Sequence, residues 1–288
     1  MSETGSTVPR RELGRLLRQT REQASVGLEA AATDLEWSRA KMYRIESGQS
    51  PVRTPDVEAM CRLYRASSEM TEVLVSLAKE SKSKGWYHAY GEVIPRWFEL
   101  YVGLEAAASR IRSYQHALVP GLLQTADYAA SLARSRPGAT TAEVQKQVAL
   151  RMERQRILTR YLPAAPLLEV IIEEGLLHKR MPDMAGQVHR LVSASQEPNV
   201  SVRIVPSERT HAHFAVAGSF VILEFPTRGA RSAEPTTVYK EGLTGALYLD
   251  RTEEVRSYAE AWAALAGDAL SEDESLALLT EIKERTHA

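Results

Sequence analysis

The sequence has a single cysteine, Cys61, no long apolar run and almost no net charge. One cysteine excludes a disulfide within the chain and a zinc site built from cysteines alone, which suits a reducing compartment. No apolar run approaches the roughly 20 residues that span a bilayer. The first residues, MSETGSTVPR, also lack a basic segment followed by an apolar one. We therefore expect a cytoplasmic protein with no membrane partner.

A formal charge of -1 over 288 residues gives the whole molecule no attraction for nucleic acid. Any binding of nucleic acid must come from an uneven distribution of charge. Residues 38–53 carry four cations and only one anion, whereas residues 250–288 carry ten acidic and four basic side chains. The length, with 44% hydrophobic residues, predicts two domains or one large and one small domain.

Motifs for catalysis are missing from the sequence, which contains no GxSxG, HExxH, phosphate-binding glycine loop or Cys-His nucleophile pair. Adjacent Glu173 and Glu174 fall at a predicted strand end, where we expect them to face solvent. His211 and His213 have the two-residue spacing of metal ligands on a strand, but we favour a loop with two polar histidines. We expect no enzyme, no cofactor and no metal site.

The first 80 residues predict a compact all-α bundle of five short helices. Leu13, Leu16 and Leu17 fall at i, i+3 and i+4, and similar spacing recurs around Leu28 and Met70. We assign residues 9–80 to this domain and residues 81–96, rich in Gly, Pro and aromatics, to a linker.

Residues 97–288 predict a mixed α/β (α+β) domain. Helices are expected over residues 96–135 and 141–161, the second introduced by a capping box at Thr140 and Glu143. Short β-rich segments then follow: PLLEVIIEE, NVSVRIVP, GSFVILEFP, TTVYK and GALYLD. A helix is expected over MAGQVHRLVSASQ, and two more near residues 252–267 and 272–286, the last capped by Ser271 with Glu274.

The segment SRAKMYRIESG, which begins at Ser38, predicts a helix with two different faces. Ser38 can cap the helix, and Met42 and Ile45 lie three residues apart on one apolar stripe. The residues outside this stripe are long cations, one small residue and a tyrosine, namely Arg39, Ala40, Lys41, Tyr43 and Arg44. A helix that enters the major groove of DNA needs long donors and a small residue that lets the backbone approach the bases. The alternative is an ordinary solvated helix face.

The preceding helix, GLEAAATDLEW, joins this segment by a short turn, which gives the size and spacing of a helix-turn-helix. Together with LGRLLRQTREQ and TPDVEAMCRLY, these segments resemble the Xre/Cro-type repressor family of DNA-binding domains. The resemblance implies that Arg39, Ala40 and Arg44 face bases, with Lys41 and Tyr43 on phosphates or the groove wall. It also implies a structural lock between Arg21 and Glu46.

Three residues depart from the family pattern. Gly27 and Leu28 stand where many members carry a polar cap and a glutamine that hold phosphate, which predicts a weaker backbone clamp. Free N–H groups at the start of that helix can still meet a phosphate. Ala31 replaces a leucine, which predicts a smaller core under the motif.

The resemblance extends beyond the first domain. The runs KGWYHAYGEVIPRWFELYVGLEAAASRIRSYQHALVPGLLQTADYA, LRMERQRIL, GSFVILEF and VYKEGLTGALYLD resemble the actinobacterial Scr-type, antitoxin-like regulators of the WhiJ kind. Membership implies a transcriptional regulator, here expected to be a repressor that binds a double-stranded DNA operator. Because helix-turn-helix domains usually bind as two-fold dimers, we also expect a homodimer. Membership also implies a small acidic partner protein of the BldB kind, and it names no effector. The rival hypothesis is a protein-interaction scaffold with a vestigial DNA-binding module.

A third hypothesis, a regulator that binds a small-molecule effector, requires a pocket in the α+β domain. Its candidate lining residues are Arg112, Tyr114, His116, His213 and Tyr239. Residues 134–160 carry seven cations and two anions, which we interpret as a solvated helix face rather than a surface for DNA or an acidic partner. Cys61 is expected in the core, with redox sensing as the alternative.

Overall fold

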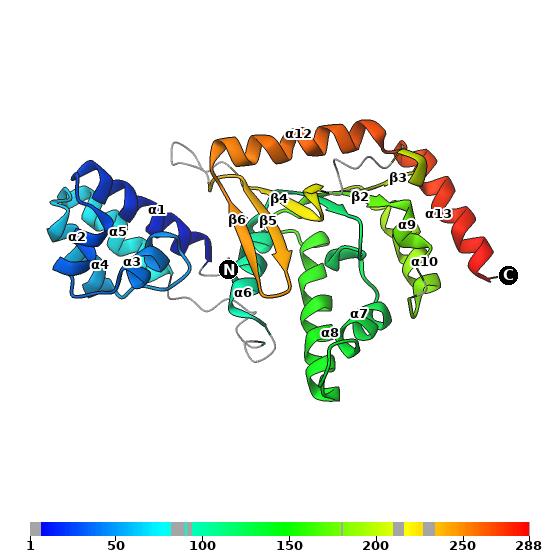
Figure 1. The fold of residues 1–288 in the computed structure, drawn as a ribbon, viewed down its shortest axis with the longest axis horizontal. Helices are drawn as coiled ribbons and strands as arrows, with labels where there is room; N and C mark the ends of the chain where they lie inside the picture. The colour runs from blue at the N-terminus through cyan, green and yellow to red at the C-terminus, as the bar shows by residue number, and fades with distance from the viewer. Residues whose placement is uncertain are drawn as a thin grey trace. The chain divides into compact units, whose positions relative to one another are not determined.

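The computed structural model describes residues 7–81, 90, 94–179, 181–209, 216–226 and 234–287. The chain divides into two compact units, residues 1–89 with 102–107 and residues 90–101 with 108–288 (Figure 1). Among the described residues, no helix is long and apolar enough to cross a bilayer.

The first unit contains the five helices that the sequence predicts. They are α1 Thr7–Gln23, α2 Leu28–Asp34, α3 Arg39–Glu46, α4 Thr54–Leu63 and α5 Ser68–Glu80. Leu13, Leu17, Met42, Met60 and Leu74 are at most 1% exposed and form one apolar core. Each helix contributes its apolar stripe to this core, so the all-α expectation for the N-terminal domain is confirmed.

Four consecutive helices, α1 to α4, end in the same way. Their terminating residues, Ser25, Glu36, Gly48 and Arg65, all have positive φ. In each case the next N–H bonds to a carbonyl five residues back, as when Trp37 N–H donates to Ala32 O at 2.8 Å. This is the Schellman motif, which satisfies the last carbonyls of a helix and turns the chain sharply. These sharp ends keep the connections short, with four residues between α1 and α2, four between α2 and α3 and seven between α3 and α4.

The second unit is built on one six-stranded sheet. Its strands, in the order β3-β2-β1-β4-β5-β6, are Val200–Val205, Leu167–Glu173, Arg110–Gln115, Phe220–Glu224, Thr237–Gly242 and Gly245–Leu249. β1, β2 and β3 are parallel, whereas β4, β5 and β6 join antiparallel. The helices of the second unit begin with the first half of α6 Arg96–Ala107, whose residues 102–107 belong to the first unit. The others are α7 Ala126–Arg134, α8 Thr141–Gln155, α9 Glu174–Leu177, α10 Met184–Ala194, α12 Thr252–Asp268 and α13 Glu272–His287. Short 3-10 turns lie at Gly121–Leu123, Arg156–Leu158 and Ser207–Arg209.

The two faces of the sheet have different neighbours. α12 runs along one face (Figure 1), where Trp262 and Leu265 join a core that includes Tyr114, Phe220 and Val238. Successive side chains of a strand point to opposite faces of the sheet. The residues that precede and follow Tyr114, Phe220 and Val238 in their strands therefore lie on the face away from α12. That second face is the one opposed by the loop after β1 and by α7 and α8.

This mixed sheet and its helices confirm the α+β expectation for the C-terminal domain. The five segments predicted as strands all form strands, and the capping boxes at Thr140 with Glu143 and Ser271 with Glu274 are present. The helix predicted over residues 96–135 was wrong in part. Residues 110–115 form β1, a central strand paired with both β2 and β4. The proposed boundaries 9–80, 81–96 and 97–288 stay predictions.

Candidate nucleic-acid interface

α2 and α3 form a helix-turn-helix joined by four residues. Glu36 adopts φ +55 and closes the Schellman end of α2. Ser38 has an extended backbone, and its hydroxyl accepts a hydrogen bond from Lys41 N–H at 3.1 Å. The serine side chain thus satisfies one of the free donors at the start of α3 and fixes where the helix begins.

α3 has a buried face and an exposed face. Met42, Ile45 and Glu46 are buried, with Met42 fully enclosed. Arg39, Ala40 and Arg44 are exposed, Lys41 is half-buried, and Tyr43 keeps 58% of its surface exposed. The exposed residues are therefore the ones that the sequence assigns to DNA, and the small Ala40 lies between two long cations.

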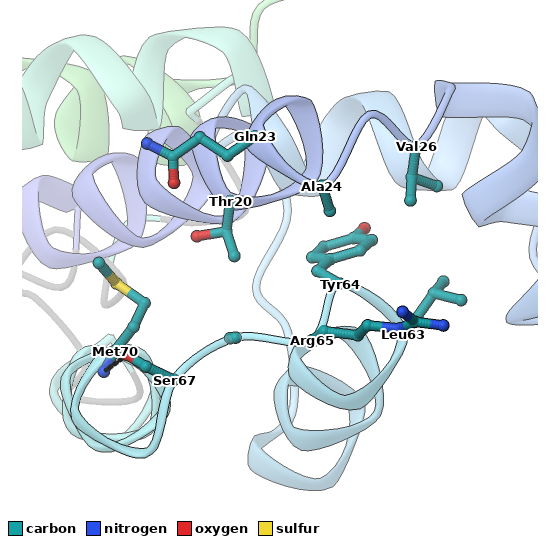
Figure 2. A pocket seen from close by; sticks show the side chains of 10 residues that line it. Thr20, Gln23, Ala24, Val26, Leu63, Tyr64, Arg65, Ser67 and Met70 are labelled. Atoms are coloured by element: carbon teal, nitrogen blue, oxygen red, sulfur yellow. Dashed lines mark hydrogen bonds between the residues drawn. The ribbon is translucent and has the colours of Figure 1, made fainter.

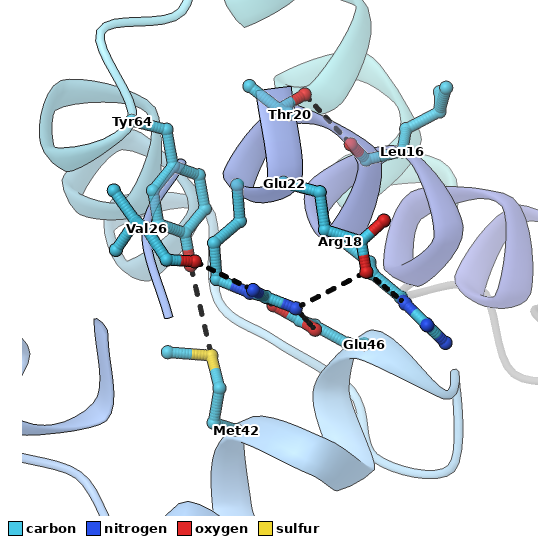
Figure 3. A network of polar contacts seen from close by, with 9 residues as sticks. Leu16, Arg18, Thr20, Glu22, Val26, Met42, Glu46 and Tyr64 are labelled. Carbon is cyan, nitrogen blue, oxygen red and sulfur yellow. Dashed lines mark hydrogen bonds and ion pairs between the residues drawn. The ribbon is translucent and has the colours of Figure 1, made fainter. Parts of the chain in front are cut away.

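Arg21 and Glu46 form a buried, bidentate ion pair (Figure 3). Arg21 Nε donates to Glu46 Oε1 at 2.7 Å, and Arg21 Nη2 donates to Oε2 at 2.9 Å. A third donor, Nη1, bonds to the carbonyl of Val26 at 2.8 Å. Hydrogen bonding to Glu46 raises the pKa of Arg21, so the guanidinium stays charged. The lock implied by the family resemblance thus joins α1 to the last turn of α3.

Two glycines bring α1 and α3 together. A Cβ atom added at Gly14 would lie 2.5 Å from the carbonyl oxygen of Ile45, so only glycine fits there. Gly48 has φ +69, and a Cβ atom there would lie 2.7 Å from the Arg11 Cα. Arg10 Nε also donates to the carbonyl of Gly48 at 2.8 Å. The C-terminal end of α3 is therefore held by backbone contact as well as by charge.

The exposed cations have local partners in this structure. Arg39 Nε lies 3.2 Å from Glu29 Oε1, with both side chains 72% exposed. Lys41 Nζ lies 3.6 Å from the ring centroid of Trp37. Arg53 forms an ion pair with Asp56 at 3.0 Å, and this lowers the pKa of Asp56. Exposed pairs of this kind are weak, so a phosphate or a base can compete for the cations.

The start of α2 has no side-chain cap, and the weaker phosphate clamp expected from the sequence stays a prediction. Gly27 occupies the capping position, and because it has no side chain it cannot bond to the free N–H groups at the start of α2. Leu28 is half-buried and packs against the apolar core, so it contributes packing. Ala31 and Ala32 are at most 2% exposed, because small residues let α2 lie close to its neighbours.

A groove of about 730 Å³ lies elsewhere on the first unit (Figure 2). Thr20 of α1 and Ala24 just after that helix form one side, and Leu63 of α4 and Met70 of α5 form the other. Tyr64 also lines it, and its hydroxyl points to the sulfur of Met42 at 3.9 Å. Burial raises the pKa of Tyr64, which keeps the phenol neutral. No residue of α3 lines this groove, so it is separate from the exposed face of that helix.

Cys61 is 3% exposed and belongs to the apolar core of the first unit. Burial raises the pKa of its thiol, which disfavours the reactive thiolate. Cys61 is therefore the core residue that the sequence predicts, and its burial gives no support to a role in redox sensing.

The proposed lining residues of the second unit do not converge on one cavity. Arg112 bonds to Glu224 and stands over the ring of Trp262 at 5.9 Å, on the face covered by α12. Tyr114 is fully buried on the same face and donates to Glu173. Glu173 therefore has a structural bond rather than the solvent-facing position expected for it. Its neighbour Glu174 accepts the N–H of Ser207 at 2.9 Å, which lowers the pKa of Glu174.

Two further candidates lie apart from these. His116 is exposed, and its Nδ1 lies 2.9 Å from Ser219 Oγ. Tyr239 lines a cavity on the opposite face of the sheet. His211 and His213 fall outside the described residues. Within the described ranges, no group of three or more His, Cys, Asp or Glu residues is arranged to hold a metal ion.

The sequence predicted that the basic segment 134–160 is a solvated helix face, but two of its arginines are partly or fully enclosed. Arg154 is only 4% exposed, with its guanidinium 4.9 Å from the ring centroid of Phe98. Arg151 Nη1 bonds to Gln124 Oε1 at 2.5 Å. Both arginines line the cavity that contains Tyr239. Sequence reasoning missed Gln124 and Phe98, because neither residue type signals a site without its spatial neighbours.

Comparison with known families gives two matches. Residues 12–74 match a helix-turn-helix domain, the part of the chain that contains the lock and the exposed face of α3. Residues 98–281 match a domain of unknown function, DUF5753, which covers more than half of the chain. Curated proteins give no match. The chain therefore belongs to the DUF5753 family, and it carries a helix-turn-helix domain ahead of the family domain.

Proposed function

We propose that the chain is a sequence-specific transcriptional regulator that binds a double-stranded DNA operator through α3. The observation that supports this is the division of α3 into two faces. One face is fixed by Met42, Ile45 and the ion pair between Arg21 and Glu46. The other presents exposed Arg39, Ala40, Tyr43 and Arg44. A rigid helix with outward donors is what recognition in the major groove requires.

The residue roles follow from position on α3. Arg39 and Arg44 are long, exposed donors that can bond guanine O6 and N7, and Ala40 lets the helix approach the bases. Ser38 and Lys41 lie at the start of α3, and Tyr43 extends from its exposed side; these are assigned to phosphates and the groove wall.

The test is a gel shift with DNA from upstream of the protein's own coding region, compared with random DNA of equal length. Arg39→Ala should cost about 1–3 kcal/mol on the cognate DNA and little on random DNA. Lys41→Ala should weaken both and reduce the salt slope by about 1. Arg62→Ala, which removes an exposed cation of α4 outside the helix-turn-helix, is the matched control.

Because Lys41 also contacts Trp37, each variant is first checked for an unchanged melting temperature. Equal losses on cognate and random DNA for both variants would contradict the base-reading assignment. A wild-type protein that shows no preference for the upstream DNA would contradict the function itself.

A second candidate function is a protein-interaction scaffold with a vestigial DNA-binding module. The absence of a side-chain cap at Gly27 is the observation that favours it. Under both hypotheses, the second unit is the proposed binding region. Its partner is either a small-molecule effector or the small acidic protein that the antitoxin-like Scr-type resemblance implies. Repeating the gel shift in the presence of the small acidic partner protein separates the two hypotheses. A regulator forms a DNA complex whose mobility or amount the partner changes, whereas a scaffold binds the partner but forms no specific DNA complex.

A further inference from the structure

A cavity of about 420 Å³ lies within the second unit. Val221 and Tyr239 of the sheet form one wall, and α7 and α8 form the opposite wall. The loop Leu118–Gln124 and Phe98 and Tyr101 of α6 close the sides. The volume falls within the range typical of sites for small organic ligands.

The described lining is basic. It includes Arg136, Arg151 and Arg154 but only one acidic residue, Glu241. Arg154 is enclosed by the rings of Phe98 and Tyr101, at 4.9 and 5.5 Å from its guanidinium carbon. Removing a cation from water strengthens its attraction for an anion that enters the same cavity.

The arginines are held in place by the loop that they face. Gln124 is 3% exposed; its Oε1 accepts from Arg151 at 2.5 Å, while its Nε2 donates to Val119 O at 2.6 Å. A Cβ atom at Gly121 would lie 3.3 Å from both terminal nitrogens of Arg154, so glycine allows the guanidinium to pack against the loop. This preorganisation lowers the cost of ordering side chains when a ligand binds.

Tyr239, which lines the same cavity, carries a buried hydroxyl. Tyr239 is 4% exposed, and its hydroxyl has no hydrogen bond of normal geometry with the described residues. Burial and the nearby carboxylate of Glu241 raise the pKa of this phenol, so it stays neutral. The ring is fixed by Tyr101, with centroids 4.1 Å apart. A buried hydroxyl without a partner is costly, and a ligand that supplies the partner removes that cost.

Apolar side chains line the rest of the cavity. Leu118, Leu132 and Leu150 come from the loop, α7 and α8, with Val221 opposite them. The cavity thus combines an apolar region with fixed cations, which matches a ligand with an apolar body and one anionic group.

We propose that this cavity binds a small organic anion, with Arg151 and Arg154 on its charged group and Tyr239 as a further hydrogen-bonding partner. This inference deepens the effector hypothesis above and rests on it. The ligand is a carboxylate or phosphate ester of a compact apolar compound.

The test uses three probes with the same body: naphthalene-1-acetate, its neutral amide, and naphthyl phosphate. Binding to the full-length protein is measured by saturation-transfer NMR and thermal shift. Ligand efficiency predicts a Kd on the order of 1 mM or tighter for compounds of this size. At least one of the anions should bind about tenfold more tightly than the amide. The stronger of the two shows whether carboxylate or phosphate is preferred.

Two variants test the assigned residues. Arg151→Gln keeps most of the side-chain volume and should weaken the anion about tenfold, with little effect on the amide. Tyr239→Phe removes only the hydroxyl, so it should leave the free protein at least as stable and weaken the anion severalfold. Arg156→Gln is the matched control, because Arg156 is exposed, pairs with Glu153 at 2.8 Å and does not line the cavity.

Three results would overturn the proposal. They are equal binding of the amide and the anions, no binding of any probe at millimolar concentration, and anion binding by both variants that equals that of the wild type. Probe binding is measured without DNA, and DNA binding is tested by substitutions in α3. The two experiments can therefore fail independently, so loss of the cavity proposal leaves the DNA-binding proposal intact.

Discussion

Arg39 has a local partner that DNA would have to displace under the proposed function. Glu29 lies 3.2 Å away on the first turn of α2, and both side chains are well exposed. An exposed pair contributes at most about 1 kcal/mol to stability, yet its carboxylate also repels an approaching phosphate backbone. If α3 binds DNA as proposed, Glu29 should lower DNA affinity more than it stabilises the free protein.

We expect Glu29→Gln to raise affinity for cognate and random DNA severalfold, with a melting temperature close to that of the wild type. Fluorescence anisotropy at two salt concentrations measures the change. Glu58→Gln, an exposed glutamate of α4, is the control for a general loss of negative charge. An unchanged affinity for Glu29→Gln would show that the pair does not affect the DNA-binding face.

Arg21 and Glu46 form a second kind of ion pair, because their side chains are only 9% and 5% exposed. Removing one partner leaves the other charge buried without compensation, which costs about 3–5 kcal/mol. Replacing both with apolar residues of similar size removes that penalty. We expect Arg21→Met and Glu46→Leu each to destabilise the protein strongly, and the double variant to recover much of the loss.

Urea unfolding of the four proteins gives the coupling free energy directly. A coupling below about 0.5 kcal/mol would mean that the two side chains act independently, contrary to their bidentate geometry. The double variant also separates stability from function, since a stable bundle without the pair should still orient α3 through Gly14 and Gly48.

The ends of α1 to α4 give a prediction about backbone conformation. Arg65 terminates α4 with φ +54, a conformation that costs a residue with a Cβ atom about 1–2 kcal/mol. Glycine adopts it freely but loses more entropy on folding. We expect Arg65→Gly to stabilise the first unit by about 0.5–1 kcal/mol.

The matched control is three residues earlier. Arg62 lies inside α4, where glycine costs about 1 kcal/mol, so Arg62→Gly should destabilise. The same chemical change should thus have opposite signs at the two positions when thermal unfolding is measured. Destabilisation by both substitutions would indicate that the Arg65 side chain contributes more than its backbone strain costs.

Local sequence signals predicted the helices of the first unit well, because each one has its own apolar stripe and a recognisable end. Gly48 was a visible end signal, whereas Ser25, Glu36 and Arg65 adopt the same conformation without the residue that normally marks it. The exposed face of α3 followed from the positions of Met42 and Ile45. Residue roles on that face stay predictions until DNA binding is measured.

Non-local pairing limited the prediction in the second unit. β1 reads as part of a helix because its arginines and serine carry weak strand preference. Its stability comes from partners far along the chain, such as Glu169 beside Arg110 at 2.5 Å. Arg154 was taken for a surface cation for the same reason, since the rings that enclose it are more than 50 positions earlier. The cavity could not be assembled from spacing alone.

A regulator of the proposed kind must read more DNA than one copy of α3 can reach. With eight residues and about 1.5 Å of rise per residue, α3 spans about 12 Å, or three to four base pairs. So short a site recurs too often to specify an operator. A homodimer that places two copies of α3 on half-sites about one helical turn apart, roughly 34 Å, would solve this problem.

We therefore expect a two-fold symmetric operator, bound by two chains, once footprinting has mapped the site. Inserting five base pairs between the half-sites turns one of them to the opposite side of the duplex. Affinity should then fall at least tenfold, to that of a single half-site, because only one α3 can reach its bases. A protein that binds one half-site as tightly as two, and remains monomeric on DNA by light scattering, would exclude the homodimer. It would also shift the search for specificity to contacts outside α3, beginning with the exposed Arg53 beside α4.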